Sequence, residues 1–276
     1  GVEMPEDSYH GQDIIDHAKN FAAIHGDKYM HTSEEERRKA LVEYALPLNI
    51  QGLERDLAKY RIHYDRWFRE STPHADGSVM KVVELLKEKG HTYEEDGATW
   101  FKATEFGADK DFVLVRGNGV PTYVVPDIAY HYGKLVTRGY DKAIDVLGAD
   151  HHGYVPRLKA ALQALGVDPS RLDVVLMQMV RLIRDGEVVK ASKRSGKAIT
   201  LVTLLDEVPI DAARFYFNLR EANSQFDFDL DLAVEQSSQN PVYYVQYAHA
   251  RICSILKKLE AEKVSIREVS AEELEK

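Results

Sequence analysis

Apolar residues recur every three to four positions along much of the chain, which predicts helices. The first predicted helix begins near Ile14, and Gly26 is placed to end it. Residues 32–36 form a helix-capping signature that opens a second helix, in which Pro47 predicts a break or a kink. The predicted helices cover residues 14–25, 34–57, 79–89, 127–132, 158–165, 200–208 and 210–220, and a long last helix begins at Asn240-Pro241.

Shorter apolar runs with β-branched and aromatic residues predict strands. The clearest is 112–115, and a Gly-Asn-Gly turn joins it to 120–125 as a predicted hairpin. Residues 71–77 are polar and predict a loop. Because strands and helices alternate in the second half of the chain, the fold class predicted is α/β with a parallel sheet. The other predicted strands are 62–68, 143–147 and 174–183.

Composition narrows the choice of protein class. The chain has 276 residues, 44% of them hydrophobic and 29% charged, which is typical of a globular protein with an ample core. No apolar run approaches roughly 18 residues, so no membrane span is expected. The single Cys253 allows no intrachain disulfide and fits a reducing cytoplasm. The net charge of -9 argues against DNA binding or a chain-wide nucleic-acid surface, so any RNA contact must be local.

Residues 190–197 form a basic loop in this acidic chain, with four cations among eight residues. The loop follows the predicted strand 174–183 and a turn at Asp185-Gly186, and it precedes Thr200, a predicted helix N-cap. A cationic loop between a strand and a helix suits a polyanion such as a nucleotide triphosphate. The same composition is also typical of a solvated surface loop.

Polar residues follow the predicted strand 143–147, where open α/β sheets bind their ligands. Gly148 allows close approach of a ligand, Asp150 can accept from ribose hydroxyls, and His151 and His152 can donate to an anion. Adjacent histidines are also metal ligands, but their side chains diverge and the nearby sequence offers no third ligand at a usual spacing. A polar strand end without a ligand is the remaining alternative.

Tyr123 and Asp127 lie four positions apart. A carboxylate can pair with a guanidinium, and a tyrosine hydroxyl or ring can orient this planar cation. A tyrosine at a strand end and an aspartate that caps a helix explain the same residues.

Several of these motifs, taken in order, resemble one enzyme family, the arginyl-tRNA synthetases of the bacterial type, which are class I synthetases. The resemblance extends over nearly the whole chain, from the stretch 5–11 to the helix after Asn240-Pro241. It implies a partial Rossmann-type parallel sheet with a helical insertion and the start of a C-terminal helical domain. The motifs are Tyr123-x-x-x-Asp127, Gly148-Ala149-Asp150-His151-His152, Gln178-Met179-Val180, Lys190-Ala191-Ser192-Lys193-Arg194 and Asp227-Phe228-Asp229.

The resemblance implies an arginine–tRNA ligase whose substrates are L-arginine, ATP with Mg²⁺, and tRNA(Arg), in the cytoplasm and without a membrane partner. It implies that Tyr123, Asp127 and His151 bind arginine. It also implies that Lys190 and Lys193, in the counterpart of the Lys-Met-Ser-Lys-Ser signature, neutralise the triphosphate during catalysis. The implied ATP-binding residues are Gly148, Asp150, His152, Met179, Val180, Lys190, Ser192, Lys193 and Arg194.

Two departures from the family pattern limit these expectations. The family's His-x-Gly-His signature is absent from this sequence, and Ala191 and Arg194 replace the Met and the last Ser of the second signature. We therefore expect a piece of a longer chain that is nearly inactive alone. The alternative is a non-catalytic relative that binds RNA or a partner subunit. The predicted domains are a helical insertion over 1–42, the catalytic domain over 43–207, and a segment over 208–276 that leads into an anticodon-binding domain. We expect the basic loop to be mobile, and the apolar stripe of the last helix to lack its partner.

Overall fold

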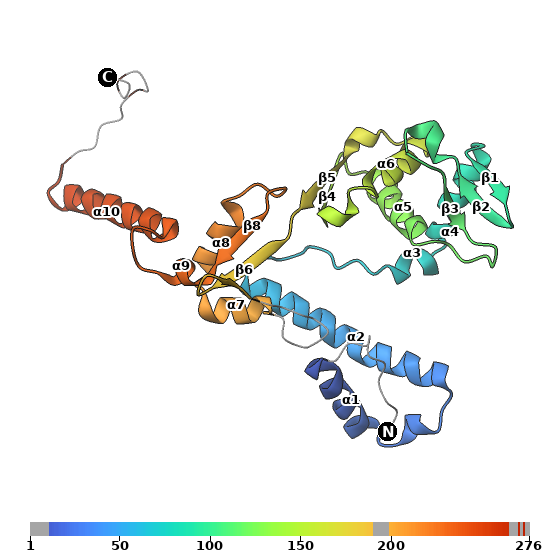
Figure 1. Ribbon diagram of the computed structural model, residues 1–276, viewed down its shortest axis with the longest axis horizontal. Helices are drawn as coiled ribbons and strands as arrows, with labels where there is room; N and C mark the ends of the chain where they lie inside the picture. The colour runs from blue at the N-terminus through green and yellow to red at the C-terminus, as the bar shows by residue number, and fades with distance from the viewer. Residues whose placement is uncertain (1–10, 190–198, 265–269, 271–272, 274–276) are drawn as a thin grey trace. The chain divides into compact units, whose positions relative to one another are not determined.

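The chain folds into two compact units in the computed structural model drawn in Figure 1. The structure describes residues 11–189, 199–264, 270 and 273. We call the unit that contains both chain ends the terminal unit and the other the central unit. The terminal unit comprises Gly1–His63, Arg181–Arg220 and Asp227–Lys276, and the central unit comprises Tyr64–Val180 and Glu221–Phe226.

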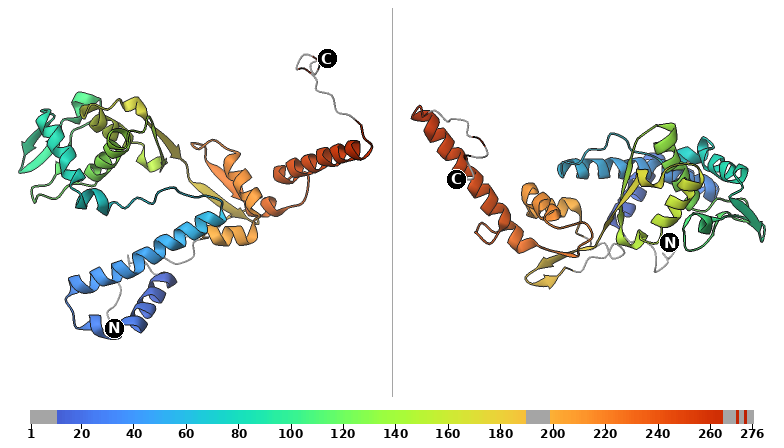
Figure 2. Two further views of the ribbon diagram at one scale, coloured as in Figure 1. Left: turned by 180° about the vertical axis from the view of Figure 1, so that it is seen from behind. Right: turned by 90° about the horizontal axis from the view of Figure 1, so that it is seen from above.

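The central unit begins with helices and an antiparallel sheet, which can be followed in both views of Figure 2. Helix α4 (Ser78–Glu88) buries one aliphatic face, as its spacing predicts. It ends before Gly90, whose φ of 76° is a conformation that favours glycine. The strands that follow are hydrogen-bonded in the order β1-β2-β3. The elements around α4 are α3 (Ser71–Ala75), β1 (Thr92–Glu95), β2 (Ala98–Phe101), η2 (Ala103–Phe106) and β3 (Phe112–Val115).

A parallel pair of strands, β4 (Ala143–Gly148) and β5 (Leu172–Met177), forms the second sheet of the central unit. Helix α6 (Val155–Ala164) connects them, so the three elements make a βαβ unit. This arrangement confirms the predicted α/β class with a parallel sheet. The remaining elements are α5 (Val124–Tyr132), the π-helical turn η3 (Gly133–Thr137), and the short turns η4 (Ala149–His151) and η5 (Pro169–Arg171).

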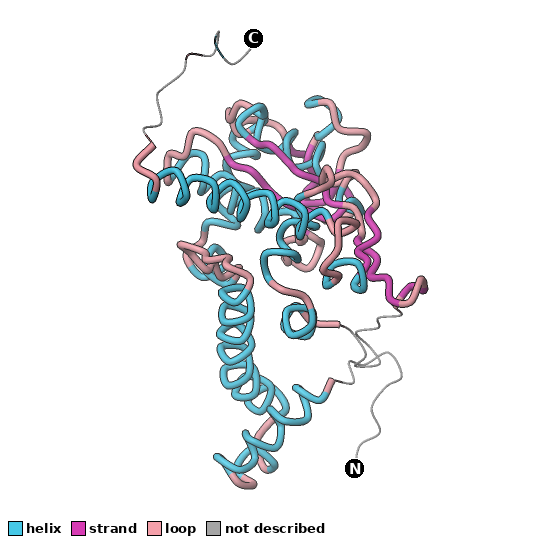
Figure 3. Tube along the Cα trace, turned by 90° about the vertical axis from the view of Figure 1, so that its left-hand side faces the viewer, coloured by secondary structure: helices cyan, strands magenta, loops and turns pink. Residues whose placement is uncertain are grey.

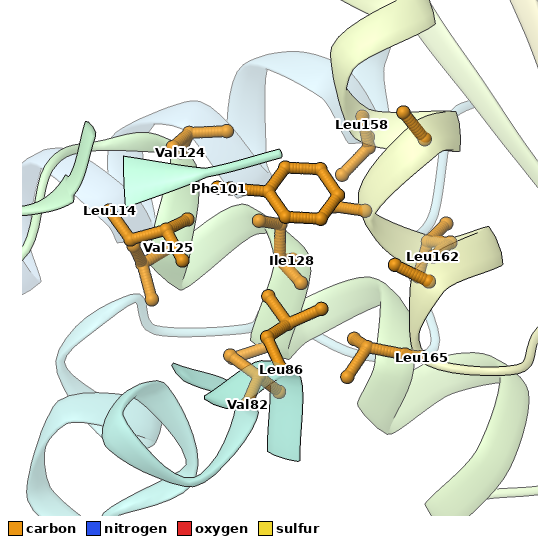
Figure 4. Close-up of a cluster of buried hydrophobic side chains, with 14 of the residues drawn as sticks. Val82, Leu86, Phe101, Leu114, Val124, Val125, Ile128, Leu158, Leu162 and Leu165 are labelled. Atoms are coloured by element: carbon orange, nitrogen blue, oxygen red, sulfur yellow. The ribbon is translucent and has the colours of Figure 1, made fainter. Parts of the chain in front are cut away.

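One hydrophobic core holds the helices α4, α5 and α6 against the antiparallel sheet. Phe101 is completely buried, and Figure 4 shows its ring beside Leu158 of α6 and Ile128 of α5. Leu86 of α4 and Leu162 of α6 are also completely buried in this cluster. Because α5 and α6 share this core, the first turn of each helix has a fixed place in the unit.

Two helices of the terminal unit, α1 (Gln12–His25) and α2 (Glu34–Lys59), confirm the helical character predicted for the first part of the chain. The hydroxyl of Ser33 accepts a hydrogen bond from the backbone N–H of Glu36, as the capping signature predicts. Helix α2 continues through Pro47, so the predicted break is wrong, and Figure 3 draws α2 as one helix. A short turn, η1 (Lys28–Met30), lies between them.

In the described residues, the rest of the terminal unit is a small sheet with four helices. The strands lie in the order β7-β6-β8, and Asp185 and Gly186, with φ of 52° and 75°, form the predicted turn between β6 and β7. None of the helices in the described residues combines the length and apolar character that a membrane span requires. The elements are β6 (Val180–Arg184), β7 (Glu187–Val188), α7 (Leu201–Glu207), α8 (Ile210–Asn218), β8 (Phe226–Asp229), α9 (Leu230–Val234) and α10 (Pro241–Ala261).

Asn240 caps α10, as the Asn-Pro pair predicts. Its side-chain oxygen accepts from the backbone N–H of Val242, and its amide donates to the carbonyl of Glu235. Among the described residues of α10, only Val242 is buried. The apolar stripe further along the helix is exposed and has no covering element in the described part of the chain, at Val245, Ile252, Ile255 and Leu256.

Two predictions for residues 62–77 are wrong. Residues 62–68 form no strand, because their aromatic side chains pack on other rings instead of on a sheet. Phe68 stacks on Tyr130 of α5 with ring centroids 4.3 Å apart. The predicted loop 71–77 contains the short helix α3.

Two predicted strands are also shorter than the apolar pattern suggests. The turn after β3 forms, but the returning segment 120–125 makes a single bridge at Pro121, and α5 begins at Val124. The run 174–183 is divided, since the backbone N–H of Gln178 donates to Ala222 and the chain then enters a different sheet. An apolar run shows where a strand is favoured, but not where the chain changes sheet.

Candidate functional site

The carboxyl ends of β4 and β5 lie side by side, because the register pairs Gly148 with Met177. The chain leaves β4 through η4, which carries Asp150 and His151, and His152 follows. These last three residues are all exposed. Ligands of open α/β sheets bind outside the carboxyl ends of strands, so this edge is the candidate site.

Gly148 leaves room at the end of β4. Its φ of -66° and ψ of 154° are open to most residues, so its conformation does not require glycine. A Cβ atom at this position would lie 2.5 Å from Oδ1 of Asp150. The Asp150 carboxylate therefore folds back over the glycine, and a larger residue would displace it.

Tyr123 and Asp127 lie at the beginning of α5. Tyr123 occupies the N-cap position with 67% of its surface exposed, and its side chain makes no capping hydrogen bond. Asp127 lies further on, within the first turn, and is half-buried. The alternative in which Asp127 caps the helix is therefore wrong. The alternative in which Tyr123 ends a strand is also wrong, because Tyr123 begins a helix.

Tyr154 joins the residues that the sequence marks for arginine. Its hydroxyl donates a hydrogen bond of 2.5 Å to Oδ2 of Asp127. Its ring centroid lies 6.0 Å from that of Tyr123 and 6.2 Å from that of His151. The structure thus brings Tyr123, Asp127 and His151 together around a fourth residue that the sequence did not identify.

The only sequence signal for Tyr154 was its spacing from His151. The backbone N–H of Tyr154 donates to the carbonyl of His151, so the junction of η4 and α6 is a tight helical turn. Residues three apart then lie close together. This spacing is informative only if the chain is already helical between His151 and Tyr154, and the apolar pattern predicts a helix only from residue 158.

Tyr154 is held as a neutral donor. Burial, followed by the hydrogen bond to Asp127 and the charge of that carboxylate, raises the pKa of Tyr154 well above its ordinary value. The phenol therefore keeps its proton across the physiological range. It can orient the carboxylate of Asp127 without cancelling its charge.

A buried charged cluster anchors α5 behind Asp127. His131 places Nδ1 2.7 Å from the backbone carbonyl of Asp127 and Nε2 2.6 Å from Oδ2 of Asp145 on β4. Lys134 donates to Oδ1 of Asp145 over 3.0 Å. Burial favours the neutral form of Asp145, but hydrogen bonds from His131 and Lys134 outweigh it and lower the pKa of this carboxyl.

Two clefts border α5, and neither suits a guanidinium. The first, of about 180 Å³, touches the rings of Tyr123 and Tyr154 but has no carboxylate in its wall. The second, of about 200 Å³, is lined by one carboxylate, Asp76, and by three cationic side chains that outnumber it and would repel a cation, namely Arg66, Lys134 and Arg138. The exposed carboxyl ends of the parallel strands remain the better place for a positively charged ligand beside Asp127.

Met179 and Val180 follow the carboxyl end of β5. Met179 is 81% exposed, and Val180 is the first residue of β6. Because Met177 pairs with Gly148, Met179 lies two residues beyond the edge that carries Gly148. Their predicted contact with adenine stays a prediction.

The basic loop lies outside the described residues, so the predicted roles of Lys190, Ser192, Lys193 and Arg194 stay predictions, as does its mobility. In the described ranges, no three His, Cys, Asp or Glu side chains are grouped as a metal site requires.

Comparison with known proteins gives one consistent match. Residues 18–254 match the family model described as tRNA synthetases class I (R), catalytic domain. The chain is 60% identical to an arginine–tRNA ligase of Caldanaerobacter subterraneus over 97% of its own length and 48% of the relative's. It is 53% identical to an arginine–tRNA ligase of Acetivibrio thermocellus over 99% of its length and 48% of that relative's. The chain therefore spans about half the length of the curated relatives that it matches.

Solved structures agree with the sequence matches. A Campylobacter jejuni protein named as an arginyl-tRNA synthetase superposes with a TM-score of 0.84 at 36% identity, covering 94% of this chain and 56% of that one. The Thermus thermophilus arginyl-tRNA synthetase gives a TM-score of 0.65 at 21% identity, covering 96% of this chain and 55% of that one, and shows the shared fold.

Proposed function

The chain belongs to the family of class I tRNA synthetase catalytic domains for arginine, and we propose that the natural protein is an arginine–tRNA ligase. It would activate L-arginine with ATP and transfer it to tRNA(Arg). The observation that carries this proposal is the grouping of Tyr123, Asp127 and His151 beside the carboxyl end of β4. The predicted division into an insertion, a catalytic domain and the start of an anticodon-binding domain is part of the same proposal.

Arginine recognition rests on Asp127 in this proposal. The carboxylate is half-buried, and the hydroxyl of Tyr154 occupies one lone pair of Oδ2. The other lone pairs can accept from a guanidinium, for which a carboxylate is the matching partner. The exposed ring of Tyr123 would cover the planar cation, and His151 would contact the polar end of the amino acid.

ATP would bind along the same strand edge. Asp150, whose carboxylate lies over Gly148, would accept from a ribose hydroxyl, and His152 would donate to the nucleotide. Gly148 would let the nucleotide approach the backbone closely. Met179 and Val180 would border the adenine.

Activation is an attack of the arginine carboxylate on the α-phosphate of ATP, which forms arginyl-adenylate and releases pyrophosphate. The protein contributes positioning and charge stabilisation rather than a covalent intermediate. Lys190 and Lys193 would neutralise the leaving pyrophosphate, with Ser192 and Arg194 beside them. Mg²⁺ would be held mainly by phosphate oxygens, which fits the lack of a cluster of carboxylates among the described residues.

The proposed cellular setting is the cytoplasm. Support comes from the single Cys253, since a chain with one cysteine forms no disulfide of its own.

The test is Asp127→Asn in the complete natural protein, with arginine-dependent aminoacylation as the readout. Loss of the charge should raise the KM for arginine by about 100-fold, because truncating a buried charge partner costs about 2–5 kcal/mol. The matched control is Asp109→Asn, an exposed aspartate of the same unit. An unchanged KM for arginine in Asp127→Asn refutes the assignment. A natural protein that binds tRNA but never aminoacylates it would instead favour the non-catalytic relative, which Ala191 in the basic loop permits.

A further inference from the structure

Tyr154 lies where three proposed arginine-binding residues meet, yet neither the sequence motifs nor the chemistry above assigns it a role. Its hydroxyl contacts the carboxylate of Asp127, and its ring faces the rings of Tyr123 and His151. We propose that Tyr154 is a positioning residue that fixes the carboxylate of Asp127 for recognition of a guanidinium. This inference rests on the proposed function.

The two ends of the hydrogen bond are held by different helices. Tyr154 is the N-cap residue of α6, and its carbonyl accepts from the backbone N–H of Leu158, a completely buried core residue. Asp127 belongs to the first turn of α5, and its own carbonyl accepts from His131. The backbone therefore fixes the position of each residue. The hydroxyl of Tyr154 adds one further constraint, because it limits the rotation of the Asp127 carboxylate.

That rotation is the freedom which recognition of a guanidinium has to remove. The χ2 torsion of aspartate is broad and roughly two-fold, so an unrestrained Asp127 carboxylate would sample many planes. Paired N–H donors of a guanidinium require one plane. With Oδ2 held by Tyr154, Oδ1 keeps its acceptor capacity, since it makes no hydrogen bond to the described residues.

A neutral donor is the suitable kind of residue for this task. The pKa of Tyr154 is raised by burial and by Asp127, so the phenol stays a donor and leaves the full negative charge on the carboxylate. Asp145 shows a different arrangement, in which a buried lysine and a buried histidine both contact the carboxylate. A lysine in place of Tyr154 would hold Asp127 equally well but would repel the substrate.

The first experiment is Tyr154→Phe in the complete natural protein, which removes the hydroxyl and keeps the ring. We expect the KM for arginine to rise by about tenfold, the size of a hydrogen bond to a charged group, while the KM for ATP stays unchanged. The control is Tyr140→Phe, which loses a hydroxyl bonded by Arg138 outside the site and should change none of these values. An unchanged KM for arginine, or an equal rise in the KM for ATP, overturns the proposal.

A double-mutant cycle shows whether Tyr154 acts through Asp127. If it does, the variant with both Tyr154→Phe and Asp127→Asn has the KM for arginine of Asp127→Asn alone. Multiplying effects would mean that Tyr154 acts on its own, and the positioning role would fail. The cycle also separates the two proposals. If Asp127→Asn leaves the KM for arginine unchanged, the proposed arginine site is refuted. If Asp127→Asn raises this KM strongly but Tyr154→Phe does not change it, only the inference on Tyr154 is refuted.

Restoring a donor at the same place guards against a packing effect of the phenylalanine. The amino group of 4-aminophenylalanine at position 154 occupies the place of the hydroxyl and can donate to Oδ2. We expect it to return the KM for arginine to within about threefold of the natural value, because the donor rather than the phenol itself is required. A KM that stays at the Tyr154→Phe level contradicts the proposal.

Discussion

Replacing Asp145 by alanine should destabilise the central unit more than any loss of an exposed ion pair. The carboxylate accepts from Nε2 of His131 over 2.6 Å and from Nζ of Lys134 over 3.0 Å. The three side chains are only 13%, 7% and 15% exposed, respectively. The alanine variant leaves the buried ammonium group of Lys134 and the buried ring nitrogen of His131 without their acceptor, for which a loss of about 3–5 kcal/mol of unfolding free energy is expected.

Asp173 on the neighbouring strand provides a matched control. It pairs with Lys142 over 2.5 Å, a shorter distance than either contact of Asp145, but about half of each side chain is exposed. An exposed pair gains little, because water and salt screen it. Asp173→Ala should therefore leave the unfolding midpoint almost unchanged, and burial rather than distance should decide the difference.

Urea unfolding followed by tryptophan fluorescence measures this difference in the right unit. The chain has two tryptophans, Trp67 and Trp100, and both belong to the central unit. The signal therefore reports unfolding of that unit. Equal midpoints for Asp145→Ala and Asp173→Ala would refute the argument that burial sets the value of the charged cluster.

The pH dependence supplies a second readout with a defined sign. The pKa of Asp145 is lowered in the folded unit, so the folded state favours the ionised carboxylate more than the unfolded chain does. The stabilisation by the ionised Asp145 is complete at a pH above the pKa of this carboxyl in the unfolded chain, about 4. It is lost as the pH falls through the lower pKa of Asp145 in the folded unit. Asp145→Asn should accordingly reduce the loss of stability on acidification, and an unchanged acid limb would contradict the lowered pKa.

Two further predictions concern the core and the last helix. Phe101→Ala should destabilise the central unit by about 3–5 kcal/mol, because its ring is completely buried among α4, α5 and α6, and the urea midpoint measured by tryptophan fluorescence checks it. Asn240→Ala should cost about 2 kcal/mol locally, since it removes the cap of α10, the buried hydrogen bond from Tyr216 and the part-buried hydrogen bond to the carbonyl of Glu235. Faster amide exchange over residues 242–247 than in Gln239→Ala is the expected result, and equal exchange in the two variants would contradict the capping role.

Local patterns in the sequence predicted most helices because their causes are local. The hydroxyl of Ser33 and the amide of Asn240 cap the helices that their positions indicate, and Gly90 follows the end of α4 with a positive φ. The strand predictions were weaker, since pairing depends on distant residues. No residue within the apolar run 174–183 indicates that the strand ends before Gln178, whose backbone N–H donates to the carbonyl of Ala222.

The candidate site could be predicted only in part for the same reason. Tyr123 and Asp127 are four residues apart and could be paired from the sequence. Their meeting with His151 depends on the packing of α5 against α6 and on Tyr154, whose spacing from His151 is informative only once the helical turn at that junction is known. The sequence marks Asp145 only as one residue of a predicted strand. Its partners are distant along the chain: His131 of α5 lies 14 residues earlier, and Lys134 of η3 lies 11 residues earlier.

The carboxylates of Asp127 and Asp145 lie close to the same histidine but have different partners. The ring of His131 contacts the backbone carbonyl of Asp127 and the side-chain carboxylate of Asp145. In the cluster, Asp145 accepts hydrogen bonds from Lys134 and His131, and the contact with His131 holds α5 to β4. Asp127, half-buried on the same helix, accepts a hydrogen bond from one neutral hydroxyl, that of Tyr154. In the part of the chain that the structure describes, Asp127 forms no ion pair, so its carboxylate can still accept hydrogen bonds from a cationic ligand. This difference between the two carboxylates supports the proposal that Asp127 pairs with a guanidinium, and that Tyr154 fixes the plane in which the carboxylate does so.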